Sequence, residues 1–237
     1  MPENLIPSYL RYLIEAALAA SLMLAVSTYN VLLEHPASPA YQALDSPIVR
    51  RGLMGLMMGT TIALFIASPW GKRSGAHFNP AVSAAFFALG KMSRDDFIGY
   101  VLAQLVGACA AMLVLVNLAG DWLAHPRINF VATRVGPQGL LWAFAAEFGL
   151  SLLLMLAVLC FSARPALAPY VPLLAGSVVA VFVLVASPLS GMSMNPARSL
   201  GSAIVGGGMR HFWLYCVAPI GGMLSAARLC RRLGFDG

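Results

Sequence analysis

Apolar residues dominate the chain in six long runs, residues 12–33, 52–68, 97–118, 140–161, 170–187 and 211–229. A helix needs about 20 mostly apolar residues to cross a bilayer, and each run meets or nearly meets this length. Polar and charged residues gather in the connections, chiefly 34–51, 121–138 and the short turn 162–165. The pattern predicts an all-α membrane protein with six transmembrane helices.

Two shorter stretches, 79–89 and 195–205, begin with the same tripeptide: Asn79, Pro80 and Ala81 in one, and Asn195, Pro196 and Ala197 in the other. Asn is a favoured helix N-cap, and Pro is favoured at the first helical position. Neither stretch is long enough to span a bilayer. We therefore expect two re-entrant half-helices that enter from opposite sides, which membranes tolerate only along a polar cavity.

The two halves of the chain repeat each other. Residues 14–26 align without gaps on residues 146–158. Each unit reads as span, span, half-helix, span, and an odd number of spans inverts the second copy relative to the first. The sequence thus predicts one channel domain built of two inverted repeats, about residues 10–120 and 138–232, with the half-helix N-termini facing each other near the middle of the membrane.

Composition agrees with a multi-pass membrane protein. Of 237 residues, 59% are hydrophobic and only 10% are charged, whereas soluble domains carry about 25% charged residues. The net charge of +6 does not favour nucleic-acid binding, because the basic residues are scattered at the ends of spans, where they flank the lipid bilayer. Four cysteines lie in or near apolar runs without a zinc-binding spacing, so we expect no disulfide, no metal and no cofactor.

The distribution of Lys and Arg predicts the orientation. With Arg198 set aside, nine basic residues fall on the side of the N-terminus and five on the other, namely Arg50, Arg51, Arg127, Arg134 and Arg210. Positive charge is enriched in cytoplasmic loops. We expect a cell-membrane protein with both termini in the cytoplasm.

Facing half-helices would direct two positive dipole ends and two Asn amides at the space between them, which favours neutral polar solutes over cations. The preceding stretches are non-helical and are expected to line the pore with backbone carbonyls; they comprise Gly75, Ala76 and His77, and Gly191, Met192 and Ser193. Arg198 lies one helical turn after Asn195, and an intramembrane Arg is usually functional. The alternative is an Arg that snorkels to the interface.

Two acidic residues, Glu15 and Glu147, occupy equivalent positions in the repeats. We expect each to accept hydrogen bonds from the backbone of the re-entrant segment in its own half; the alternative is a relay in a coupled transporter or ion channel. His77 is expected to brace its loop rather than to act as a titrating gate. A membrane serine protease built on Ser190 would need a histidine base, and the interiors of the later spans contain none.

Residues 74–82 and 193–199 resemble the signatures of the aquaporin, or major intrinsic protein, family, in its bacterial or nodulin-26-like form. The resemblance implies a right-handed six-span bundle with one pore per protomer, assembled as a homotetramer. It also implies a passive channel, not an enzyme, that conducts water and small uncharged solutes such as glycerol, urea, ammonia or metalloid acids and excludes protons and ions.

The same resemblance predicts a selectivity filter of Met58, Val183, Met192 and Arg198. Val183 stands twelve positions before Asn195, where orthodox water channels carry a His, and Met192 replaces a residue that is usually small. An ungapped count from Asn79 selects Gly59 in place of Met58. A filter with Arg198 opposite an apolar wall is expected to pass at least one small neutral solute besides water.

Overall fold

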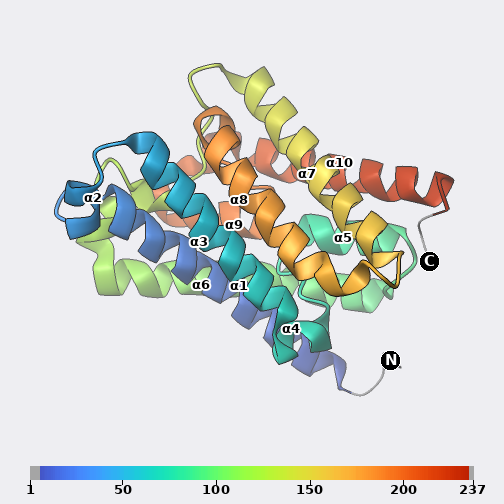
Figure 1. Ribbon diagram of the computed structural model, residues 1–237. Helices are drawn as coiled ribbons and strands as arrows, with labels where there is room; N and C mark the ends of the chain where they lie inside the picture. The colour runs from blue at the N-terminus through green and yellow to red at the C-terminus, as the bar shows by residue number, and fades with distance from the viewer. Residues whose placement is uncertain (1–5, 235–237) are drawn as a thin grey trace.

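The computed structural model describes residues 6–234, and this part of the chain is built of helices (Figure 1). The α-helices are α1 (Ser8–Glu34), α2 (Pro39–Ala43), α3 (Pro47–Ala67), α4 (Pro69–Ser74), α5 (Pro80–Ala88), α6 (Arg94–Ala124), α7 (Leu140–Ser162), α8 (Val171–Ser190), α9 (Pro196–Gly206) and α10 (Phe212–Arg232). Three short 3₁₀ turns, η1 (Asn129–Val131), η2 (Ala168–Tyr170) and η3 (Gly208–His211), lie in the connections.

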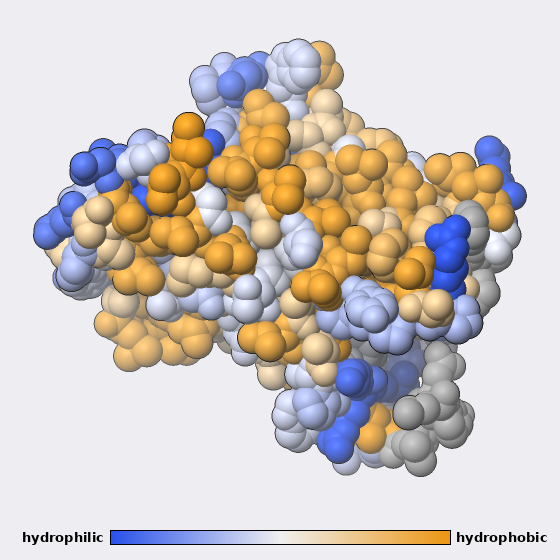
Figure 2. All heavy atoms as spheres, in the orientation of Figure 1, coloured by the Kyte–Doolittle hydropathy of each residue, from blue (hydrophilic) through white to orange (hydrophobic). Residues whose placement is uncertain are grey.

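Six of the described helices, α1, α3, α6, α7, α8 and α10, are long and apolar enough to cross a membrane. Their outer faces carry exposed apolar side chains, and Leu118 and Leu141 are each 78% exposed. Figure 2 shows hydrophobic side chains across the middle of one face, over α3, α8 and α7, and hydrophilic ones at the end that carries α2. A broad exposed apolar surface of this kind is matched to lipid rather than to water.

Helix boundaries extend beyond the apolar runs where a cap and polar residues permit it. α3 begins at Pro47 rather than near residue 52, because the Ser46 side chain accepts a hydrogen bond from the backbone of Val49 and Pro47 fits the first turn. α6 begins at Arg94, capped by Ser93, and continues to Ala124 across a non-helical residue, Ala119. The connection 34–51 contains the short helix α2, and a second short helix, α4, follows α3; neither was predicted from the sequence.

The membrane helices approach one another at glycines. A Cβ on Gly59 would lie 2.3 Å from the carbonyl oxygen of Gly176, so α3 and α8 are in backbone contact there. The pairs α1–α6 and α7–α10 use equivalent positions: Gly107 packs on Ala16, and Gly222 packs on Phe148. Small residues permit such close approach between membrane helices. Both contacts join residues at corresponding positions of the two predicted repeats.

Candidate functional site

The two half-helices begin at their Asn residues, as expected. The side-chain oxygen of Asn79 accepts a hydrogen bond from the backbone of Ala81, and that of Asn195 accepts hydrogen bonds from Ala197 and Arg198. Pro80 and Pro196 occupy the first helical positions. Each half-helix therefore starts at a fixed residue, which places the two Asn amides where the half-helices meet.

The stretch before each half-helix is folded by the same left-handed backbone pattern. Positive φ values occur at Gly75, Ala76 and Phe78 in the first copy and at Gly191, Met192 and Met194 in the second. Residues other than glycine adopt this region only at an energetic cost of about 1–2 kcal/mol each. The surrounding structure must hold these stretches in place.

Glu15 holds the first stretch. Its carboxylate accepts hydrogen bonds from the backbone N–H groups of His77 at 3.0 Å and Phe78 at 2.6 Å. It also accepts from the Ser74 hydroxyl at 2.7 Å and from the Gln104 amide at 2.7 Å. Glu15 is fully buried in α1. A buried carboxylate with these donors is a fixed structural acceptor.

Glu147 holds the second stretch in the equivalent way. Its carboxylate accepts from the backbone N–H groups of Ser193 at 2.9 Å and Met194 at 2.7 Å, and from the Ser190 hydroxyl at 2.6 Å. The hydroxyl of Tyr215 donates to the carbonyl of Ser190 at 2.7 Å, as Tyr100 does to the carbonyl of Ser74. The Ser190 hydroxyl is thus committed to Glu147.

The two halves differ beyond these carboxylates. In the first half, the His77 ring contacts the Ser83 hydroxyl at 3.1 Å and stacks on Phe86. In the second, Ser193 takes the place of His77, and its hydroxyl lies 2.6 Å from that of Ser199. The Ser199 hydroxyl accepts from Thr133 at 3.2 Å, which ties the segment between α6 and α7 to α9.

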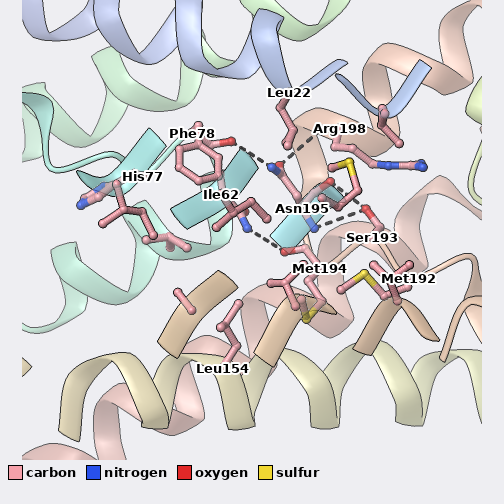
Figure 3. Close-up of a pocket in the computed structure, with 18 of the residues that line it drawn as sticks. Leu22, Ile62, His77, Phe78, Leu154, Met192, Ser193, Met194, Asn195 and Arg198 are labelled. Carbon is pink, nitrogen blue, oxygen red and sulfur yellow. Dashed lines mark hydrogen bonds between the residues drawn. The ribbon is translucent and has the colours of Figure 1, made fainter. Parts of the chain in front are cut away.

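The two Asn residues are joined across the centre. The Asn79 amide donates to the carbonyl of Met194 at 2.8 Å, and the Asn195 amide donates to the carbonyl of Phe78, also at 2.8 Å (Figure 3). Each amide nitrogen carries two N–H donors, so one donor on each remains for another acceptor.

A cavity of about 430 Å³ runs past this junction. Both Asn residues line it, together with all four residues of the predicted filter, Met58, Val183, Met192 and Arg198. The six residues whose backbone carbonyls were predicted to line the pore also line it: Gly75, Ala76, His77, Gly191, Met192 and Ser193. Pro80, Ala81, Pro196 and Ala197 are buried behind the wall and do not line it. Glu15 and Glu147 do not line it either.

The side walls of the cavity are unequal in polarity. Met58, Val183 and Met192 are each 8% exposed and present apolar surface. Gly59 faces α8 rather than the cavity. Figure 3 shows Arg198 and Met192 on the same side of Asn195. Arg198 lines the cavity, and among the described residues its buried Nη1 atom has no hydrogen-bond partner.

Some lining residues did not emerge from the sequence. Phe78 and Met194 line the cavity and accept the Asn amides. The sequence shows that each residue immediately precedes an Asn-Pro-Ala tripeptide. A hydrophobic side chain does not indicate, however, that the backbone carbonyl of the residue accepts a hydrogen bond. Arg127 also lines the cavity, although the sequence suggested only an outer-loop position for it.

Six membrane-capable helices, two half-helices that meet at their N-termini and a cavity past that junction define a membrane channel of the re-entrant type. The model of the Major intrinsic protein family matches residues 6–228. The chain therefore belongs to the major intrinsic protein family and is a passive membrane channel for water and small solutes.

Individual relatives agree with this assignment. The chain is 34% identical over 207 residues to Aquaporin NIP1-2 of Arabidopsis thaliana, covering 85% of this chain and 69% of the relative. It is 33% identical over 191 residues to Glycerol uptake facilitator protein-like 6 of Lactiplantibacillus plantarum, covering 77% and 85%. The X-ray structure of the aquaglyceroporin from Plasmodium falciparum shares the fold, with a TM-score of 0.77, 22% identity and coverage of 96% and 97%.

Proposed function

We propose that the cavity is the conduction pathway and that Asn79, Asn195 and Arg198 supply its hydrogen-bond donors. The observation that carries the proposal is that all three line one cavity, although Asn79 comes from the first half of the chain and Asn195 and Arg198 come from the second. Water or a small solute that leaves its hydration shell needs replacement partners along its path. The Asn amides supply donors at the centre, and the carbonyls of the left-handed stretches supply acceptors on both sides.

Met58, Val183, Met192 and Arg198 form the selectivity filter in this proposal. Arg198 offers a donor on one wall, while the other three offer only apolar surface. A filter with one polar wall accommodates a solute with one hydrogen-bonding edge and one apolar edge. We assign water and small neutral solutes such as glycerol or urea as the permeants; the relative that is named as a glycerol uptake facilitator supports this class.

Protons and cations are excluded. The half-helices α5 and α9 direct the positive ends of their dipoles at the junction, and Arg198 adds a full positive charge. An ion-coupled mechanism would need a carboxylate in the pathway, and the described lining contains no Asp or Glu. Glu15 and Glu147 are structural acceptors in this proposal, and the protein is not an enzyme.

The assembly and orientation follow from the family resemblance and the charge distribution. We assign a homotetramer with one pore per protomer, located in the cell membrane with both termini in the cytoplasm. The start of α1 and the end of α10 lie at the same end of the bundle, away from α2, which supports two termini on one side (Figure 1).

Stopped-flow light scattering of proteoliposomes under an osmotic step tests the proposal. Water flux above that of empty liposomes, followed by reswelling in glycerol or urea, is the expected result. A current or a proton leak through the parent protein in planar bilayers would overturn the proposed exclusion of ions.

A further inference from the structure

Arg127 lines the same cavity as Arg198, from the segment between α6 and α7. These are the two guanidinium groups on the wall, and the lining residues within 6–234 include no carboxylate. Glu147, behind the wall, interacts electrostatically with Arg198 but not with Arg127. Arg127 is exposed, whereas Arg198 is partly buried. Arg127 therefore stands at the mouth of the cavity, and Arg198 stands deeper along it.

The aromatic ring of Tyr41, in α2, positions Arg127. The Cζ atom of Arg127 lies 5.2 Å from the ring centroid, and that of Arg50 lies 4.5 Å from the same centroid. Arg50 is fixed by Glu34 at 3.1 Å and by the carbonyl of Leu44 at 2.6 Å. The charge of Arg50 is thus neutralised, while Arg127 forms no ion pair with any described residue. Tyr41 holds an uncompensated cation at the mouth.

The backbone of the segment is also held in place. Ile128 and Val131, each 4% exposed, belong to the hydrophobic core. Residues Asn129, Phe130 and Val131 have φ values of 45°, 53° and 50°, which are unfavourable for Phe and Val. Beyond them, the backbone N–H of Gly136 donates to the carbonyl of Leu189 at 2.9 Å. Anchors on both sides make the position of Arg127 a property of the fold.

We propose that Arg127 is a second specificity-determining residue, and that its charge repels cations and concentrates anions at the mouth before any solute reaches Arg198. Tyr41 is the positioning residue. This inference rests on the proposed conduction through the cavity. Charge in a cleft with low-dielectric walls changes local ion concentrations by about tenfold or more. Its effect is screened within about 3 Å at 1 M salt but reaches about 30 Å at 0.01 M.

The charge at the mouth can be measured with a reporter thiol. Ala132 lines the cavity, so a cysteine at this position reports on the potential there. The Ala132→Cys protein is reacted separately with an anionic and a cationic methanethiosulfonate reagent of similar size, and the two reaction rates are compared. The parent protein gives the background from native cysteines. Arg127→Met should lower the ratio of anionic to cationic reaction rates about tenfold at low salt, and by much less at 1 M salt.

Two further variants separate position from charge. Arg127→Lys should preserve most of the ratio, and Tyr41→Leu should lower it in part. The matched control is Arg134→Met, because Arg134 is exposed on the same segment but does not line the cavity. If Arg127→Met leaves the ratio unchanged, or if Arg134→Met lowers it equally, the inference is wrong.

Proton leak gives a second measurement on reconstituted protein. Arg198→Val is compared with the double variant Arg198→Val, Arg127→Met, and the leak of each is normalised to the amount of folded protein in the liposomes. The double variant should leak about tenfold more at low salt; an equal leak contradicts the inference. The proposed conduction through the cavity is tested independently of Arg127. It is wrong if modification of the Ala132→Cys thiol leaves water flux unchanged.

Discussion

Asn79 and Asn195 exchange hydrogen bonds reciprocally: the amide of each donates to the carbonyl of the residue immediately before the other, at 2.8 Å in both cases. The same two side chains cap their own half-helices through their oxygens. Each Asn thus fixes its own half-helix, binds the opposite re-entrant stretch and keeps one N–H for a solute. These three roles require an amide, since a carboxylate has no donor and a hydroxyl has too few groups.

Replacing Asn195 with Asp should impair both folding and ion exclusion. The carboxylate can still cap α9, but it cannot donate to the carbonyl of Phe78, and it places a negative charge at the dipole junction. The lost buried hydrogen bond should lower the free energy of unfolding by about 1–3 kcal/mol. Thermal unfolding in detergent and cation conductance in planar bilayers measure the two effects.

The neutral variant Asn195→Ser is the control for charge. It also loses the bond to Phe78 and should be destabilised, but it should remain impermeable to cations. If the Ser variant has the same cation conductance as the Asp variant, the negative charge at the junction is not the cause of cation conduction.

Replacing Glu147 with Gln should reduce stability and leave ion exclusion intact. The carboxylate accepts from Ser190, Ser193 and Met194, and Gln offers one acceptor oxygen where Glu offers two. At least one buried N–H loses its partner, which costs about 1–3 kcal/mol. Yield, thermal stability and proton leak are compared with those of Glu15→Gln, the equivalent change in the first half. A Gln variant of parent stability that no longer transports would assign Glu147 to the transport step instead.

The sequence predicted the membrane helices and half-helices because their signals are local. Apolar runs set the six spans, and Asn followed by Pro set the starts of α5 and α9. Helix ends were less predictable: Ser46 and Ser93 begin their helices within polar sequence that a count of apolar residues excludes. The extension of α3 and α6 depends on these caps rather than on hydropathy.

The site was predictable where the repeat or the family resemblance marked a residue. The choice between Met58 and Gly59 was open, because it depends on the rotation of α3 about its axis. In the structure the close contact of Gly59 with Gly176 sets this rotation and turns Met58 to the cavity. Arg127 was assigned only to the outer side, since its contact with Tyr41 joins residues far apart in the sequence.

Mercurial reagents should not block the parent protein. None of the four cysteines lines the described cavity: Cys109, Cys160, Cys216 and Cys230 all lie elsewhere in the bundle. Val183→Cys should create a block of water flux by HgCl₂ that thiol reagents reverse, because Val183 lines the cavity. The matched control is Val185→Cys, also in α8 but 64% exposed on the outer face. A block at Val185→Cys and none at Val183→Cys would contradict the placement of the filter.

Trimming Met192 tests how the filter selects among neutral solutes. Met192 lines the cavity next to Val183, with which it packs in one apolar cluster. Its unbranched side chain adds bulk that can also deform. Met192→Ala should raise glycerol and urea flux several-fold while changing water flux little, because a wider opening matters most for the larger solutes. Met58→Ala should act in the same direction.

Met57→Ala is the matched control, since Met57 precedes Met58 in α3 but does not line the cavity. Truncation of a buried Met lowers the free energy of unfolding by about 2–5 kcal/mol, so each flux is normalised to the amount of folded protein in the liposomes. Because stability and flux are then separate measurements, a Met192→Ala variant that is destabilised and keeps the parent's solute fluxes would place Met192 in the packing of the bundle and outside the constriction.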